Sequence, residues 1–178
     1  MALNKLILLT LTATTAFLDH VLGHPQAQPH LQRRAQTSFR LKTSPNNLYV
    51  QSYHTGAGLS DAVLTTDKST ASTFVLMNDT NLQREDTTGQ GFTWGLTMDP
   101  ANNYAGWEFV KIKAGTSTPG FSIDDDGKVS WDGDPQFDGW LVCDWWHNAP
   151  QLFWIVASRA DRAFPSTCQR VSLVTERT

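Results

Sequence analysis

One stretch decides the fold of this chain: Trp140-Leu141-Val142-Cys143-Asp144-Trp145-Trp146-His147-Asn148-Ala149-Pro150-Gln151-Leu152-Phe153-Trp154-Ile155-Val156. Two apolar runs rich in aromatic and β-branched residues flank the turn-forming residues His147–Pro150, which predicts a hairpin. Side chains alternate along a strand, yet neither side of the first run is polar. A strand that is apolar on both sides belongs inside a packed β-structure, although a short buried helix has a similar composition.

Short runs with the composition of strands recur on both sides of this hairpin. They are rich in aromatic and β-branched residues, and clusters of Gly, Pro, Asn and Asp separate them. Together with the hairpin they number about eleven: residues 39–43, 48–53, 62–65, 72–77, 92–98, 107–113, 121–123, 128–131, 140–146, 151–156 and 170–174. None of these runs has a sustained helical period.

About eleven to twelve short strands predict an all-β fold in a single compact domain over residues 35–178. A β-trefoil-like barrel has twelve strands in three similar units, and the spacing of Phe39, Phe92 and Phe121 favours it. A β-sandwich is the alternative, because the three units share no motif beyond an aromatic strand, a turn and a second strand.

The N-terminus has the parts of a secretory signal peptide. Met1–Lys5 is short and mildly basic, and Leu6–Leu18 is apolar but too short to span a bilayer comfortably. Val21-Leu22-Gly23 then supplies small or modest residues at a cleavage site. Residues 1–23 are therefore expected to be a signal peptide. Residues 24–34 are expected to be a propeptide that ends at the dibasic processing site Arg33-Arg34.

Removal of residues 1–34 changes the charge balance of the chain. The mature chain keeps 11 basic and 16 acidic residues, a net charge of −5. Nucleic acid is not expected as a partner, because binding it requires a basic surface. No further hydrophobic segment follows the signal peptide, so no membrane association is expected after signal removal.

Two cysteines and one asparagine are the expected sites of covalent modification. Cys143 and Cys168 are expected to form a disulfide, because export leads to an oxidising compartment. This bond would tie the central hairpin to the C-terminal segment and stabilise the fold by about 3–4 kcal/mol. Asn78-Asp79-Thr80 matches the N-glycosylation pattern at an expected turn, so Asn78 is the expected acceptor.

Acidic residues cluster between positions 124 and 138, but they do not complete a calcium loop. Asp124, Asp126 and Gly127 occupy the third, fifth and sixth places of such a loop, whereas Gly133 stands where a bidentate glutamate is required. Turn formation explains the same aspartates. No metal and no cofactor is expected.

Catalytic residues are not expected either. A glycosidase needs two carboxylates across a sugar, and Glu108 and Asp144, both within apolar strands, are the candidates. An unpaired carboxylate at Asp144 would be costly in such an apolar region. Asp144 is therefore expected to reach the surface at the strand end or, in the preferred structural role, to accept hydrogen bonds from the turn at His147 and Asn148.

Seven tryptophans suggest carbohydrate stacking, because an exposed indole offers apolar surface to a sugar ring. Most of them are expected in the core. Trp131, Trp145 and Trp146 lie beside polar turns and are the expected exposed rings. With His147 they are the candidate ligand-binding residues.

Cys143–His147 followed by Pro150–Trp154 resembles a block found in an uncharacterised family of small secreted fungal proteins with a domain of unknown function. Leu48–Leu59 resembles an upstream block of the same family. The family is distantly similar to a fungal cell-wall protein linked to conidiation. The resemblance covers residues 39–174 and implies a secreted fungal β-domain, and it brings no catalytic residues with it.

These observations predict a secreted β-domain without enzymatic activity. The protein is expected either at the cell wall or released outside the cell, where it could act as an effector-like protein. The expected partner is a cell-wall glycan or a host protein. A carbohydrate-binding, lectin-like module is the alternative function, and a small secreted hydrolase is the third.

Overall fold

The computed structural model describes residues 37–85, 89, 91–102 and 104–178, and β-strands build the domain within them. The expected signal peptide, the propeptide and the Arg33-Arg34 site lie outside these residues. The described elements are β1 (Phe39–Ser44), β2 (Tyr49–Gly56), β3 (Leu59–Thr65), η1 (Lys68–Thr70), β4 (Thr73–Met77), β5 (Asn81–Arg84), β6 (Trp94–Met98), β7 (Trp107–Ala114), β8 (Phe121–Ile123), β9 (Val129–Trp131), β10 (Phe137–Asp144), β11 (Pro150–Val156), η2 (Ala157–Arg159) and β12 (Gln169–Arg177). The two η elements are single turns of 3-10 helix, so the all-β prediction is confirmed.

Three antiparallel hairpins, β2–β3, β6–β7 and β10–β11, form the cap of the fold. Their second strands pair with one another: β3 with β7, β7 with β11, and β11 with β3. This mutual pairing gives the cap an approximate three-fold arrangement. The third hairpin is the one predicted from Trp140–Val156, and its strands pair from Trp140 with Trp154 to Asp144 with Pro150.

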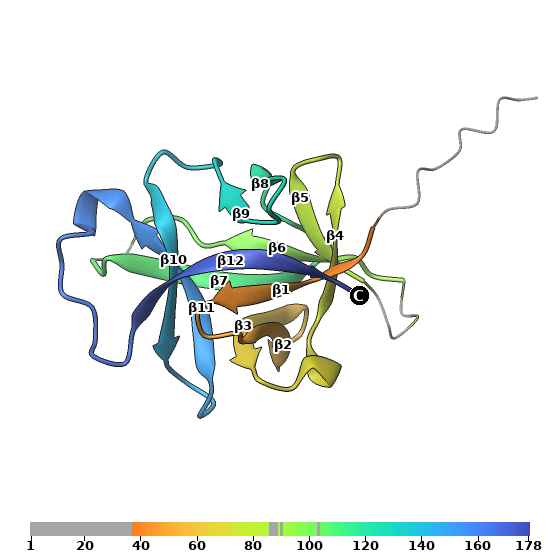
Figure 1. The fold of residues 1–178 in the computed structure, drawn as a ribbon, viewed down its shortest axis with the longest axis horizontal. Coiled ribbons are helices and arrows are strands. Elements are labelled where there is room, and N and C mark those ends of the chain that lie inside the picture. The colour runs from red at the N-terminus through yellow and green to blue at the C-terminus, as the bar shows by residue number, and fades with distance from the viewer. Residues whose placement is uncertain (1–36, 86–88, 90, 103) are drawn as a thin grey trace, which may run out of the picture. The chain divides into compact units, whose positions relative to one another are not determined.

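The other strands close the barrel. β1 pairs with both β12 and β4, β4 pairs with β5, and β8 pairs with β9. A closed ring of nine strands can be followed in the order β10, β12, β1, β4, β5, β6, β7, β3, β11 and back to β10. The β-trefoil-like barrel is therefore confirmed. Figure 1 shows β1 and β12 side by side, although they are the first and last strands of the described chain.

The three structural units are β1–β4, β5–β8 and β9–β12, but the phenylalanines that suggested them are not equivalent. Phe39 begins the first strand of the first unit, whereas Phe121 begins the last strand of the second. Phe92 precedes β6 and is 62% exposed. The spacing of the three phenylalanines therefore favoured the correct fold, although these residues do not occupy equivalent positions in the three units.

Large apolar side chains fill the barrel and the inner face of the cap. Three tryptophans belong to this core, and the indole N–H of each one makes a hydrogen bond. Their Nε1–H groups donate to backbone carbonyl groups: Trp131 to Pro119 at 2.8 Å, Trp140 to Val129 at 3.0 Å and Trp154 to Asp99 at 3.0 Å. These bonds allow a buried indole to keep a hydrogen-bond partner.

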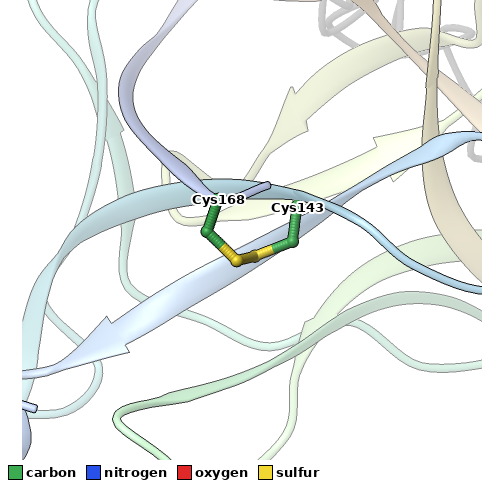
Figure 2. The surroundings of a disulfide bond; sticks show 2 residues. All are labelled: Cys143 and Cys168. Carbon is green, nitrogen blue, oxygen red and sulfur yellow. A yellow bond between two sulfur atoms is a disulfide. The ribbon is translucent and has the colours of Figure 1, made fainter. Parts of the chain in front are cut away.

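The outer face of the β10–β11 hairpin is buried by a second, smaller cluster. Leu141, Cys143, Phe153 and Ile155 form its centre, and Phe164 packs against it from the segment that leads to β12. The Cys143–Cys168 disulfide ties this segment to β10, as Figure 2 shows. The predicted pairing of the cysteines is confirmed, and the segment explains why the hairpin is apolar on both faces.

Candidate functional site

Six side chains form a ring on the outer face of the cap, which we call the cap ring. They belong to β3, β7 and β11 and alternate with the residues that face the barrel core. Pairing between the three strands places them side by side, because directly paired residues share a face of the sheet. The pairs are Val63 with Gln151, Phe153 with Phe109, and Lys111 with Asp61.

The β10–β11 turn, Trp145–Ala149, rests on the cap ring, and we call it the aromatic turn. The indole of Trp145 packs edge-on against Phe109 and Phe153, with ring centroids 6.2 and 5.6 Å apart. The His147 imidazole stacks on Tyr53 of β2 at a centroid distance of 4.1 Å. Side chains from three different hairpins therefore hold the turn in place.

A hydrogen bond fixes the aromatic turn to β3. Nε2 of His147 lies 3.1 Å from Oδ2 of Asp61, which is 86 residues away in the sequence. An ionised carboxylate can only accept, so the imidazole N–H donates this bond. Asp61 is thereby the acidic residue that positions the turn.

The backbone of the aromatic turn is left-handed at two consecutive residues. His147 has a φ of 65° and Asn148 a φ of 53°. Asn and His adopt this region more readily than most side chains, although it remains uncommon for both. This geometry reverses the chain within a few residues and directs His147 toward Asp61.

Three aromatic side chains are exposed around this turn. Trp146 is 69% exposed, Tyr53 44% and Trp145 37%. The prediction that Trp145 and Trp146 reach the surface is confirmed. The aromatic turn therefore presents apolar ring surface next to the polar groups of His147 and Asp61.

Trp131 does not belong to this surface, and its predicted exposure is wrong. It is only 6% exposed, and its ring packs against Trp154 and Phe137 in the core. The polar residues after Trp131 form a turn, whereas β9 itself faces the barrel, so the polarity of the neighbours does not indicate exposure of the ring. A Cβ at Gly133 would collide with the indole, so glycine leaves the space in which this ring lies.

Asp144 takes the first of its two expected placements. It is exposed at the end of β10. Among the described residues, none donates a hydrogen bond to its side chain from the turn, so the preferred structural role is wrong. Asp61 from β3 performs that role instead.

The two carboxylates considered for glycoside hydrolysis lie too far apart to act as a pair. On β11, Trp154 pairs with Glu108 and Pro150 with Asp144. Four residues of strand separate these positions, or about 13 Å. Carboxylate pairs in glycosidases are about 5–9.5 Å apart. Glu108 is also 2% exposed, within the core side of β7.

Sequence reasoning missed three members of the site: Tyr53, Asp61 and Gln151. Tyr53 and Asp61 face each other on β2 and β3, and only the hairpin register reveals this. Gln151 is fully buried, and neither of its side-chain polar atoms has a hydrogen-bond partner in the described part of the chain. In the sequence, Gln151 stands out only as a polar residue near the start of the otherwise apolar strand β11, and this was the signal that could have identified it.

Asn78 is exposed, as a glycosylation acceptor must be. It lies in the tight turn between β4 and β5, where Asn78 and Asp79 have φ values of 49° and 59°. The N–H of Thr80 donates to the carbonyl of Met77 at 3.1 Å and closes the turn. Its glycosylation remains a prediction.

The acidic residues before β9 serve a turn. Oδ1 of Asp124 accepts hydrogen bonds from the backbone N–H groups of Asp126 at 3.1 Å and Lys128 at 2.8 Å. Within residues 37–85, 89, 91–102 and 104–178, no group of three or more His, Cys, Asp or Glu side chains could hold a metal ion. No helix among them is both long enough and apolar enough to cross a bilayer.

A large pKa shift belongs to a cluster formed by other residues. Hydrogen bonds from Lys68 and Lys42, with a smaller one from the Tyr49 hydroxyl, lower the pKa of Glu176 to about 2. Lys42 Nζ lies 3.2 Å from Oε2 of Glu176, and the Tyr49 hydroxyl lies 3.1 Å from the same oxygen. This cluster joins β12 to β1, β2 and η1.

Comparison with known proteins gives a family without an assigned activity. No curated protein and no solved structure matches the chain. Residues 30–177 match a family described as a domain of unknown function, DUF7907. This match includes the whole barrel and the aromatic turn, and the chain therefore belongs to the DUF7907 family.

Proposed function

We propose that this protein is a secreted, non-enzymatic fungal β-domain that binds a cell-wall glycan through its aromatic turn. The observation that carries the proposal is the exposure of Trp146, Tyr53 and Trp145 around one turn. Large exposed apolar surface is costly in water and is typical of an interaction site. The flat rings suit the apolar C–H face of a pyranose.

The surroundings of the exposed rings also support this proposal. Trp145 packs on two phenylalanine rings, and His147 contacts both Tyr53 and Asp61. Asp61 and His147 add polar groups beside the rings, which a ligand rich in hydroxyl groups can use.

The disulfide supports export, while the charge of the chain and the spacing of its carboxylates support the binding of a neutral glycan. The Cys143–Cys168 bond is compatible with an oxidising compartment. A net charge of −5 after processing at Arg34 favours a neutral glycan over a polyanion as the partner. The separation of Glu108 and Asp144 supports a binding role over glycoside hydrolysis.

Binding to insoluble polysaccharide tests the proposal. The purified domain is expected to be retained on β-glucan or chitin particles, and Trp146→Ala to abolish retention while the circular dichroism spectrum stays unchanged. Phe92→Ala is the matched control, because this ring is 62% exposed and lies outside the aromatic turn. Equal retention of the Trp146→Ala variant, or no retention of the unaltered domain, would contradict the proposal.

A further inference from the structure

Gln151 is a polar residue in a fully buried position. Its side chain is fully buried, and neither Nε2 nor Oε1 has a hydrogen-bond partner among the described residues. A buried amide without partners is destabilising, because the hydrogen bonds that it made with water are not replaced. Such a group in an otherwise well-packed fold points to a use for its polar atoms.

The strand register places this amide beneath the path of the aromatic turn. Gln151 lies in the cap ring, where it pairs with Val63 on β3 and with Cys143 on β10. Because β3 and β11 are antiparallel, Asp61 lies two residues beyond Val63, on the side away from the turn. His147 must therefore fold back across Gln151 to reach Asp61.

The contacts that hold the aromatic turn there are few and separable. They are the His147–Asp61 hydrogen bond, the stacking of His147 on Tyr53 and the edge contacts of Trp145 with the two phenylalanines. The left-handed residues His147 and Asn148 add strain to the closed form. Opening would give up these contacts but would relieve the strain and free the Gln151 amide for new hydrogen bonds.

We propose that the aromatic turn opens on the cap ring and that Gln151 then binds the glycan directly. This inference rests on the proposed function and adds the polar subsite of the same site. A carboxamide presents a donor and an acceptor side by side. Two adjacent hydroxyl groups of a pyranose match this pair, and so does the acetamido group of an N-acetylated sugar. Asp61 and His147, released from each other, add an acceptor and a donor at the rim of the ring.

Titration calorimetry with a soluble β-glucan oligosaccharide and a chitin oligosaccharide tests this subsite. The glucan offers adjacent hydroxyl groups and the chitin fragment offers acetamido groups, so the arm that gives heat identifies the chemistry recognised. Gln151→Met is expected to weaken binding in that arm about tenfold or more, since it removes two hydrogen bonds. Gln51→Met is the matched control. Gln51 lies on β2 and pairs with Val63 on the edge opposite to Gln151, but it is only partly buried. The affinity of the Gln51→Met variant for the oligosaccharide should stay within twofold of the unaltered domain.

The possible outcomes separate the two proposals. Unchanged affinity of a folded Gln151→Met variant overturns the subsite and leaves the aromatic surface as the binding site. Absence of binding by the unaltered domain in both arms overturns both proposals. A second measurement avoids dependence on the variant: the side-chain amide signal of Gln151 in an NMR spectrum of the unaltered domain must shift on addition of the bound oligosaccharide. A signal that does not move also overturns the subsite.

Discussion

Replacing Gln151 with Met should stabilise this domain. The two side chains have nearly the same length and volume, so the substitution keeps the packing of the cap ring. It removes a side-chain amide whose nitrogen and oxygen are both buried without partners. Most core substitutions destabilise a protein, and a gain here would be direct evidence that the amide is unsatisfied.

The size of the gain follows from these two polar atoms. A buried polar group without a partner costs about 1–3 kcal/mol, and the nitrogen and oxygen of one amide share part of this cost. We expect a net gain of about 2 kcal/mol in the free energy of unfolding. For a domain of this size, that gain corresponds to a rise in Tm of roughly 5–8 °C.

Urea unfolding followed by tryptophan fluorescence measures this gain, and calorimetry gives Tm. The unaltered domain, Gln151→Met and Gln51→Met should be compared at the same pH and protein concentration. Gln51 is partly exposed, so its substitution should change the free energy of unfolding by less than about 0.5 kcal/mol. A loss of stability in Gln151→Met would show that the amide has partners in solution, and the argument from its burial would fail.

Two further predictions concern the disulfide and the last strand, β12. Replacing both Cys143 and Cys168 with Ser should lower the free energy of unfolding by about 3–4 kcal/mol, because the bond closes a loop with a sequence separation of 25. Urea unfolding measures this loss, and an unchanged midpoint would contradict the prediction. Glu176 has a pKa lowered from 4.5 to about 2 in the folded state, so its stabilising effect is present above pH 4.5 and is lost as the pH falls toward 2. Tm measured from pH 7 to pH 2 should therefore fall less steeply in Glu176→Gln, and parallel curves would disprove the role of this cluster.

The hairpin and the fold class were predictable because they depend on local patterns. The two apolar runs of Trp140–Val156 needed only a turn between them, and Pro150 with Asn148 supplied its signal. The cysteine pairing followed from the count of two and an oxidising compartment. These features need no knowledge of which distant strands are neighbours.

The errors concern properties that depend on distant strands. Trp131 was predicted to be exposed from the polar residues beside it, yet the space beside Gly133 and the neighbouring Trp154 ring decide its burial. Asp144 was predicted to hold the turn because it is close in sequence, whereas Asp61 does so from 86 residues away. The cap ring unites three hairpins whose pairing no local pattern reveals.

The pairing of β1 with β12 has a consequence for the order of folding. Six residue pairs join these strands, from Phe39 with Arg177 to Ser44 with Ser172. The barrel therefore cannot close until β12 has left the ribosome, and contacts between such distant positions form slowly. Until β12 emerges, β1 and β10 lack their shared partner, and the ring of strands in the nascent domain stays open.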